Sequence, residues 1–293
     1  MKHFAFLAAS VLLALPTFAQ KHILDAPQVP VHKRVKAPMP THAVLDIDHR
    51  PETPIDGTHN LVHDHVQSRD LVIERQVIGI TQYDLQSNAA IDDRMAGNGS
   101  AVSAAWTMSL DVTPFEDRGT GYNFYDGSGW GEEPYERIEN VRIGWPSINH
   151  LGDGREVVIS HAGIDTPLHM VRRDAGTGTW EDSDLPNYAI LDDGNPVGNL
   201  WPRAAVGGIN DEIIHVICIS TPVANGGFEY QGQDGALLYY RSMDSGDTWE
   251  MTTFPELDSS NFVNISADAY SIHADGGMVA FAVFNDLSDS FIM

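Results

Sequence analysis

The chain has 293 residues, and its 41 acidic and 17 basic residues give a formal net charge of −24 at pH 7. This excess of negative charge argues against nucleic acid and anionic membrane surfaces as partners, because both are themselves anionic. The single cysteine, Cys218, excludes an internal disulfide. The fold must therefore be stabilised by packing, and we expect Cys218 to be a small buried hydrophobe.

The N-terminus has the pattern of a secretory signal peptide. The apolar stretch Phe4–Leu15 follows Lys2, and the small residue Ala19 stands at the expected cleavage site before Gln20. A membrane-spanning helix needs about 20 apolar residues, and this stretch is shorter. We therefore predict a signal peptide over residues 1–19 and a secreted mature protein without a membrane span.

Residues 20–68 are rich in proline and histidine and show neither a helical nor a strand period, which predicts a flexible leader. Within it, His63-Asp64-His65 could be taken for a metal cluster, since alternate residues of an extended chain point the same way. No cysteine or glutamate is spaced to complete such a site. We expect a solvated polar stretch and no metal.

The sequence pattern is different over residues 69–293. Short apolar runs alternate with glycine, aspartate, asparagine and proline, whereas no long segment keeps a 3.6-residue period with caps at both ends. Short strands at even spacing are typical of a sandwich, a barrel or a propeller. We therefore predict one all-β domain over this range.

Internal repetition favours the propeller. The pairs Trp145-Pro146 and Trp201-Pro202 are separated by the same spacing as Glu156 and Glu212. Each pair is followed by a tight turn, two apolar strands and a glycine-containing turn that ends in tryptophan. Units of about 50 to 65 residues with four strands each are typical of β-propeller blades.

Two further units are less regular. One has a predicted strand over 101–108 and a shortened turn that ends at Trp130. The other begins at 263–266, turns at 274–277 and reaches Met293 within its third strand. We therefore expect about three and a half four-stranded blades. The interruption within a repeat predicts a fragment of a longer protein, whose missing C-terminal blades would cover the last unit.

One turn of the second regular unit carries a distinct motif. A short polar side chain can accept hydrogen bonds from its own turn, glycine can adopt a positive φ, and tryptophan can anchor the returning strand. The motif consists of Ser242, Asp244, Gly246 and Trp249.

This motif resembles the Asp-box, or BNR repeat, of secreted bacterial sialidase-like β-propellers, and the resemblance covers about residues 100–293. Asp174, Gly176 and Trp180 match it with one inserted residue. In that superfamily the Asp-box joins the third and fourth strands of a blade on the face opposite the active site. The resemblance therefore implies a structural role. A calcium role would need several oxygen ligands at alternate positions, and these are not seen.

The resemblance also implies a possible activity. Sialidases of this fold clamp the substrate carboxylate with three arginines, and use a tyrosine–glutamate pair as nucleophile and an aspartate as acid/base. The Arg-Ile-Pro signature of the family has no counterpart here. The nearest strings, Arg137-Ile138-Glu139 and Arg142-Ile143-Gly144, lack the proline. Catalytic residues are therefore not assigned, and whether the protein is an enzyme stays open.

A binding face can be placed by the same resemblance, which puts inner-strand starts and certain loops at the ligand face of the propeller. Aromatic rings and charged groups there suit sugars or peptides. The alternative is that the tryptophans recur because they pack identically in each unit. The candidate ligand-binding residues are Arg142, Trp145, His161, Asp165, Trp201, Arg203 and Tyr230.

Two functions from different classes follow. The first is a secreted, non-catalytic propeller that binds carbohydrate or an extracellular protein. The alternative is a glycoside hydrolase of the exo-sialidase type. We expect no cofactor, since phosphate-binding loops and zinc-type Cys/His spacings are missing from the sequence.

Overall fold

The computed structural model describes residues 75–86, 93–284 and 291–292, all within one compact unit, Val72–Met293. The predicted signal peptide (1–19) and leader (20–68) lie outside the described residues. Helix is confined here to short 3₁₀ turns such as η3 (Val223–Asn225) and η4 (Pro255–Leu257). No helix in the described ranges is long and apolar enough to cross a membrane.

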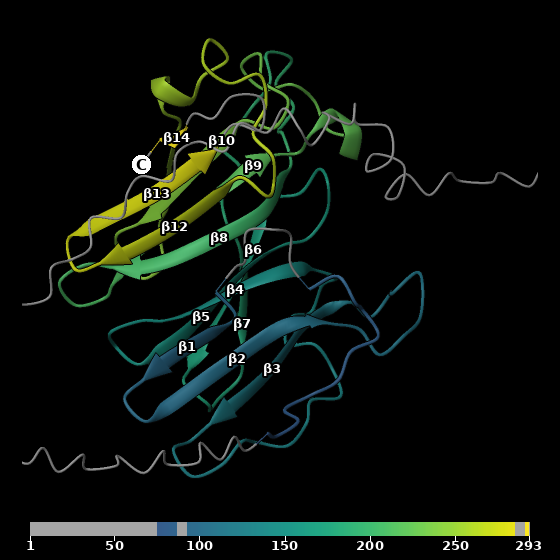
Figure 1. Cartoon of the computed structure of the whole chain (residues 1–293), viewed down its shortest axis with the longest axis vertical. Coiled ribbons are helices and arrows are strands. Elements are labelled where there is room, and N and C mark those ends of the chain that lie inside the picture. The colour runs from purple at the N-terminus through teal and green to yellow at the C-terminus, as the bar shows by residue number, and fades with distance from the viewer. Residues whose placement is uncertain (1–74, 87–92, 285–290, 293) are drawn as a thin grey trace, which may run out of the picture. The chain divides into compact units, whose positions relative to one another are not determined.

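The strands form four antiparallel sheets, each built from consecutive strands (Figure 1). The first sheet contains β1 (Met95–Asn98), β2 (Ala101–Met108) and β3 (Gly119–Tyr125). The second contains β4 (Gly144–His150), β5 (Arg155–His161), β6 (Leu168–Asp174) and β7 (Glu181–Asp184). The third contains β8 (Asn199–Gly207), β9 (Ile213–Ser220), β10 (Leu237–Ser242) and β11 (Glu250–Thr252). The fourth contains β12 (Tyr270–Asp275), β13 (Met278–Phe284) and β14 (Phe291–Ile292).

The all-β prediction is confirmed, and the two regular units of the sequence are the four-stranded second and third sheets. The expectation of four strands does not hold for the described part of the first sheet, which shows three, whereas the fourth sheet has the expected turn between β12 and β13 and a third strand, β14, at the predicted position. The fourth unit was predicted to begin at 263–266, but its first strand is β12, which lies after that segment. That segment instead forms a single bridge from Asn264 to Asp234.

The first strands of successive sheets lie side by side. Ser147 of β4 donates its hydroxyl to the Ala204 carbonyl of β8 and accepts a hydrogen bond from the Ala204 amide at 3.1 Å. The Ile148 amide of β4 donates to the Asp93 carbonyl, just before β1. A methyl group built on Gly207 of β8 would lie 3.1 Å from the Ala274 Cβ of β12. Each sheet therefore packs on the next through its first strand.

Apolar side chains fill the spaces between neighbouring sheets. Along β5, Val157 and Ile159 belong to the cluster shared with the third sheet, whereas Val158 belongs to the cluster shared with the first. This is the alternation of a strand that is covered on both faces. Cys218 is fully buried in the cluster between the second and third sheets, as predicted, and burial raises the pKa of its thiol.

Both Trp-Pro pairs form the same irregular start of a strand. Trp145 and Trp201 have φ values of 54° and 52°, a left-handed conformation that is rare for residues other than glycine. The pairing of β4 with β5 shifts register between Gly144 and Ser147, and that of β8 with β9 shifts between Leu200 and Arg203. The repeated motif therefore marks a β-bulge that re-aims the tryptophan.

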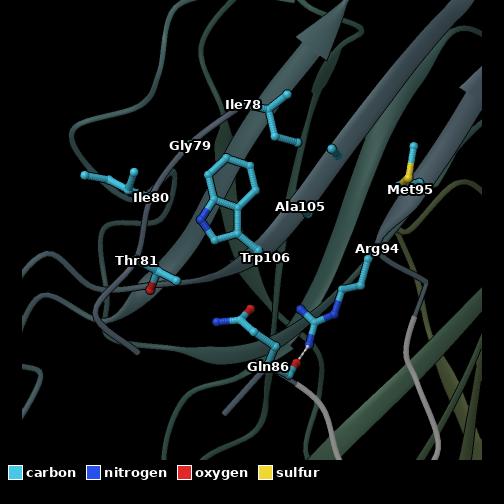
Figure 2. A pocket seen from close by; sticks show the side chains of 10 residues that line it. Ile78, Gly79, Ile80, Thr81, Gln86, Arg94, Met95, Ala105 and Trp106 are labelled. Carbon is cyan, nitrogen blue, oxygen red and sulfur yellow. Dashed lines mark hydrogen bonds between the residues drawn. The ribbon is translucent and has the colours of Figure 1, made fainter. Parts of the chain in front are cut away.

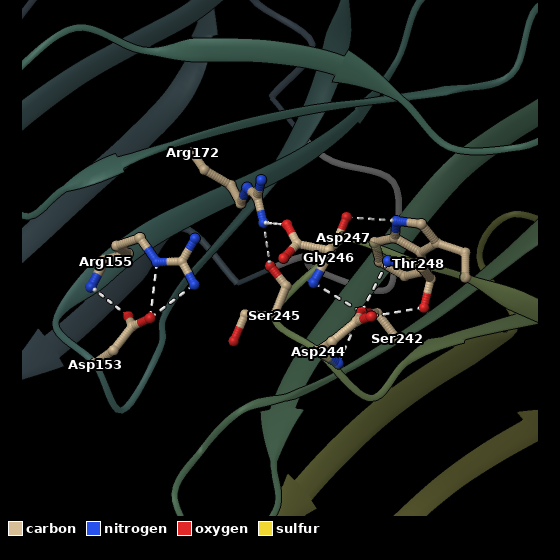
Figure 3. Close-up of polar contacts among 10 residues, drawn as sticks. Asp153, Arg155, Arg172, Ser242, Asp244, Ser245, Gly246, Asp247 and Thr248 are labelled. Carbon is tan, nitrogen blue, oxygen red and sulfur yellow. Dashed lines mark hydrogen bonds and ion pairs between the residues drawn. The ribbon is translucent and has the colours of Figure 1, made fainter.

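The turn from Ser242 to Trp249 is closed by its own side chains (Figure 3). Asp244 accepts hydrogen bonds from the Thr248 amide at 2.8 Å and the Thr248 hydroxyl at 2.7 Å, and these contacts lower the pKa of its carboxyl. The Gly246 amide donates to Ser242 Oγ at 2.7 Å. Gly246 has a φ of 94° and lies against Met170, so a Cβ here would be both strained and crowded.

The same turn reaches the neighbouring sheet. Arg172 of β6 donates to the Ser245 carbonyl at 2.6 Å and to Asp247 Oδ1 at 2.8 Å (Figure 3). The corresponding Asp174–Trp180 turn of the second sheet uses a different acceptor, because the Gly176 amide donates to Glu156 Oε2 at 3.0 Å. Each turn is thus tied to the sheet before it, since Glu156 also contacts the first sheet.

We predict that replacing Asp244 by alanine lowers the free energy of unfolding by about 1–3 kcal/mol, because the turn amide and hydroxyl lose their acceptor. The matched control is Asp174→Ala, since no hydrogen bond to the Asp174 carboxylate is found among the described residues, and it should cost less than about 0.5 kcal/mol. Urea unfolding of both variants measures the difference. Equal losses would show that Asp244 does not close its turn in this way.

Candidate functional site

Two arginines and several aromatic rings meet where β4 and β8 begin. We call this set the Arg118 cluster; it comprises Tyr83, Arg118, Arg142, Trp145, His161 and Trp201. The segment before β1 supplies Tyr83, the loops before β3 and β4 supply the arginines, and the end of β5 supplies the histidine. The two bulges supply the tryptophans.

Arg118 lies at the centre of the cluster. Its guanidinium carbon is 5.3 Å from the ring centre of Tyr83 and 5.5 Å from that of Trp145, within the range of cation–π attraction. Its Nε donates to the Ile143 carbonyl at 2.9 Å. The guanidinium also lies on Gly144, where a methyl group would be 3.3 Å away, so a small residue is needed at that position.

Arg142 adds a second positive charge from the next loop. Its Nε donates to the Phe115 carbonyl at 2.9 Å and its Nη2 donates to the Pro114 carbonyl. Burial and the nearby Arg142 lower the pKa of Arg118, although it stays charged at physiological pH. Among the described residues, no carboxylate lies within ion-pair distance of Arg118 or Arg142.

His161 holds the two bulges together. Its ring stacks on Trp145 with the ring centres 5.0 Å apart and the planes at 20°. Its Nδ1 accepts the Trp201 amide at 3.1 Å, which requires the ring proton to be on Nε2 in the neutral form. Burial, with smaller effects of Arg118 and Arg142, lowers the pKa of His161 to about 3.

His161 should therefore make folding stability depend on pH. Its pKa in the unfolded chain is near 6.5, so the unfolded state binds the proton more readily between pH 6.5 and about 3. Stability is fully present above that window and falls as pH decreases through it, by up to about 1.4 kcal/mol per pH unit. Urea unfolding of wild type and His161→Asn at about pH 7 and about pH 5 measures this. Asparagine keeps an acceptor for Trp201 but does not titrate, and an unchanged pH slope in this variant would contradict the assignment.

The other residues proposed from the sequence lie outside the cluster. Arg203 is 3% exposed, lies 4.0 Å over the ring of Tyr270 and donates to the Ala267 carbonyl, between the third and fourth sheets. Tyr230 is buried in the core between the second and third sheets. Asp165 is exposed in the loop after β5, and no contact joins it to the cluster among the described residues.

Trp145 and Trp201 differ in exposure. Trp145 is 8% exposed, covered by Tyr83 and His161, whereas Trp201 is half-buried and meets His161 edge to face. Trp145 Nε1 is buried without a hydrogen-bond partner among the described residues. Trp145 thus orients the cluster from beneath, and Trp201 offers a partly exposed ring.

Tyr83 and Arg118 were missed by reasoning from the sequence. Tyr83 precedes the first recognisable repeat, and Arg118 lies in the β2–β3 connection of the less regular first unit. Their proximity follows only from the way the first sheet packs on the second. No local pattern around either residue distinguishes it from a solvated surface residue.

A hollow lies apart from the cluster, beside Trp106 on the first sheet, with a volume of about 400 Å³ (Figure 2). Its lining is largely apolar, with Ile78, Ile80 and Met95 around the indole ring. Arg94, at its edge, donates to the Gln86 carbonyl. Because charged groups do not converge on a common point in this hollow, we assign no ligand to it.

Comparison with known proteins gives limited information. No family model and no curated protein matches the chain. Among solved structures, a Hadza microbial sialidase is 12% identical, with 69% of this chain and 43% of that chain covered and a TM-score of 0.42. A family 117 glycoside hydrolase produced by the marine bacterium Zobellia galactanivorans is 10% identical, with 70% and 64% covered and a TM-score of 0.43.

A third similar structure belongs to work on the GH130 family of mannoside phosphorylases, which contains glycoside hydrolases that target β-1,2 mannosidic linkages in Candida mannan. It is 12% identical, with 59% of this chain and 51% of that chain covered and a TM-score of 0.36. The chain spans less than two thirds of each of these three proteins. At these identities and TM-scores the likeness says nothing about activity.

Proposed function

We propose that the chain is a secreted, propeller-type module whose Arg118 cluster binds an acidic carbohydrate without cleaving it. One observation carries this proposal. Arg118 and Arg142 share a surface with aromatic rings, and no described carboxylate lies within ion-pair distance of either guanidinium. In a protein with a net charge of −24, two arginines left without an acidic partner are available for an external anion.

The polar atoms of the cluster are mostly donors. Both arginines have donors only, whereas Trp145 Nε1 and the protonated Nε2 of the neutral His161 belong to side chains that are buried. Tyr83 Oη already accepts from Arg118 at 3.4 Å. A ligand must therefore supply acceptors, and a carboxylate or sulfate supplies several at once. The partly exposed ring of Trp201 adds an apolar surface on which a sugar ring can lie.

The propeller architecture is supported by the sheets themselves. The second and third sheets each have four antiparallel strands in sequence order, and β4, β8 and β12 lie next to one another. This is how inner strands follow each other around a propeller axis. The Arg118 cluster gathers at the start of β4 and β8, whereas the Ser242–Trp249 turn closes the opposite ends of the strands.

The exo-sialidase alternative needs an activated tyrosine near the arginines. A tyrosine–glutamate pair does occur, because Tyr122 donates its hydroxyl to Glu156 at 2.7 Å. Glu156 and His161 lie at opposite ends of β5, about 16 Å apart at the rise of an extended strand. Burial, and then Glu156, raise the pKa of Tyr122, so its phenol stays neutral and is a poor nucleophile. We therefore favour binding over hydrolysis.

The test is a glycan array that pairs carboxylated or sulfated glycans with neutral ones of the same backbone, alongside a fluorogenic sialoside assay. We expect the protein to be retained by the acidic glycans and not by their neutral counterparts, and we expect no release of the fluorophore. Equal retention of neutral glycans, or none of either, would contradict the proposal. Turnover of the sialoside would favour the hydrolase instead.

A further inference from the structure

Two exposed turns of the described chain contain the dipeptide Asn-Gly, and they differ in hydrogen bonding and packing. Asn98 ends β1 and Gly99 begins the two-residue turn to β2, whereas Asn225-Gly226 ends the 3₁₀ turn η3. Both asparagine side chains are exposed to solvent. The two sites therefore have the same local sequence in two different backbone conformations.

Asn-Gly is chemically labile when its backbone can move. The glycine amide nitrogen bonds to the asparagine side-chain carbonyl carbon, the carbon–nitrogen bond of the side-chain amide breaks, and ammonia leaves with the proton from glycine. A five-membered succinimide results. Water then opens either ring carbon–nitrogen bond to give aspartate or isoaspartate. Glycine favours the attack because it has no side chain to block the approach.

At Asn98 little opposes this attack. Asn98 pairs with Ala101 across a two-residue turn, and no hydrogen bond from the Gly99 amide is found among the described residues. No described atom lies within 4 Å of a Cβ built on Gly99. The Asn98 side chain likewise makes no hydrogen bond there, and β1 is a four-residue strand at the edge of its sheet. The peptide unit can therefore rotate at small cost.

At Asn225 the attacking atom, the Gly226 amide nitrogen, is already engaged in a hydrogen bond. The Gly226 amide donates to the Val223 carbonyl at 3.0 Å, and the Gly227 amide donates to the Pro222 carbonyl at 3.0 Å. A Cβ on Gly226 would lie 3.0 Å from Ile164, so the turn is also packed against a neighbouring loop. Attack by the Gly226 nitrogen requires both hydrogen bonds to open first.

We propose that Asn98 is a site of spontaneous deamidation in the folded protein, whereas Asn225 is protected by its turn. Isoaspartate would lengthen the backbone of a two-residue turn by one carbon and add a negative charge. Ser100 of the same turn lies against Gly127, where a methyl group would be 2.9 Å from Ser100 Oγ. The modified turn should therefore loosen the β1–β2 hairpin, which forms the edge of the first sheet.

The test follows both sites by peptide mass spectrometry during incubation of the folded chain at about pH 8 and 37 °C, with a parallel sample in urea. Opening two hydrogen bonds at about 0.5–1.5 kcal/mol each should make Asn98 react about tenfold faster or more in the folded chain. The two rates should converge in urea, where neither turn persists. Separation of the aspartate and isoaspartate peptides would establish the succinimide route.

Asn98→Gln serves as the control, because closing a larger ring is slow, and it should remove the modification at this position while Asn225 is unaffected. Equal rates in the folded chain, or faster reaction at Asn225, would overturn the proposal. So would a rate difference that persists unchanged in urea, since the cause would then be local sequence and not structure.

Discussion

Replacing Glu156 by alanine is expected to lower the free energy of unfolding by about 3–5 kcal/mol, the range found when one partner of a buried ionic network is removed. The Glu156 carboxylate is fully buried. It accepts from Ser103 and Tyr122 of the first sheet and from Gly176 of the Asp174–Trp180 turn. Arg173 Nε lies 3.3 Å from its Oε2.

Loss of this carboxylate would leave the partly buried Arg173 between the rings of Tyr122 and Trp180, at 4.4 and 4.3 Å, without its counter-ion. It would also leave the hydroxyls of the first sheet without an acceptor. The first and second sheets would therefore lose their main polar link. Guanidinium chloride unfolding measures the change, and a shift in the midpoint without a change in slope would show that the native state alone is affected.

Glu212→Ala is the matched control. Glu212 stands at the same point of the next repeat, but it is partly exposed, and its carboxylate accepts only from the Asn210 amide, at 2.8 Å, in the described structure. We expect its loss to cost less than about 1 kcal/mol. Similar losses at Glu156 and Glu212 would mean that the buried network contributes little to stability.

Replacing Arg118 or Arg142 by glutamine is expected to weaken binding of an acidic glycan about tenfold or more each, because a charge-assisted hydrogen bond contributes about 1.5–3 kcal/mol. The affinity should also fall with added salt, since at least one charge is near the surface. Between about pH 5 and pH 9 it should stay constant, because both arginines remain charged and His161 stays neutral above its pKa of about 3. Isothermal titration calorimetry measures all three dependences.

Arg155→Gln controls for the loss of one positive charge. Arg155 is paired with Asp153 at 2.7 Å (Figure 3). It lies at the opposite end of β5 from His161. Its removal should leave the glycan affinity within about twofold of wild type, since exposed ion pairs contribute little. An equal loss at Arg155 would show that overall charge, and not the cluster, determines binding.

Much of the fold could be predicted because it depends on local patterns. The apolar run at 101–108 forms β2 with these bounds, and the glycine-containing turn at Ser242–Trp249 closes with the hydrogen bonds that its residue types favour. The internal sequence repeat then identified the corresponding strands of the second and third sheets. The fourth unit was predicted to begin at 263–266, before its first strand β12, because a short apolar run does not reveal where strand pairing starts.

The candidate site was less predictable because it depends on contacts between sheets. The sequence does not predict the left-handed φ of Trp145 and Trp201, because tryptophan ordinarily avoids that conformation. Arg203 matched the pattern of a ligand-facing residue, yet its side chain lies in the space between two sheets. From the sequence, Glu156 was useful only as a marker for aligning the two repeats. The structure shows that it joins the first and second sheets.

The most direct test of the proposed function is a titration of wild type and the Arg118→Gln/Arg142→Gln double variant with a carboxylated sugar and with its uncharged methyl ester. The wild type should bind the acid at least about tenfold more tightly than the ester, and this preference should disappear in the double variant. Retention of the full preference without the two arginines would contradict the assignment of the Arg118 cluster as an anion-binding site.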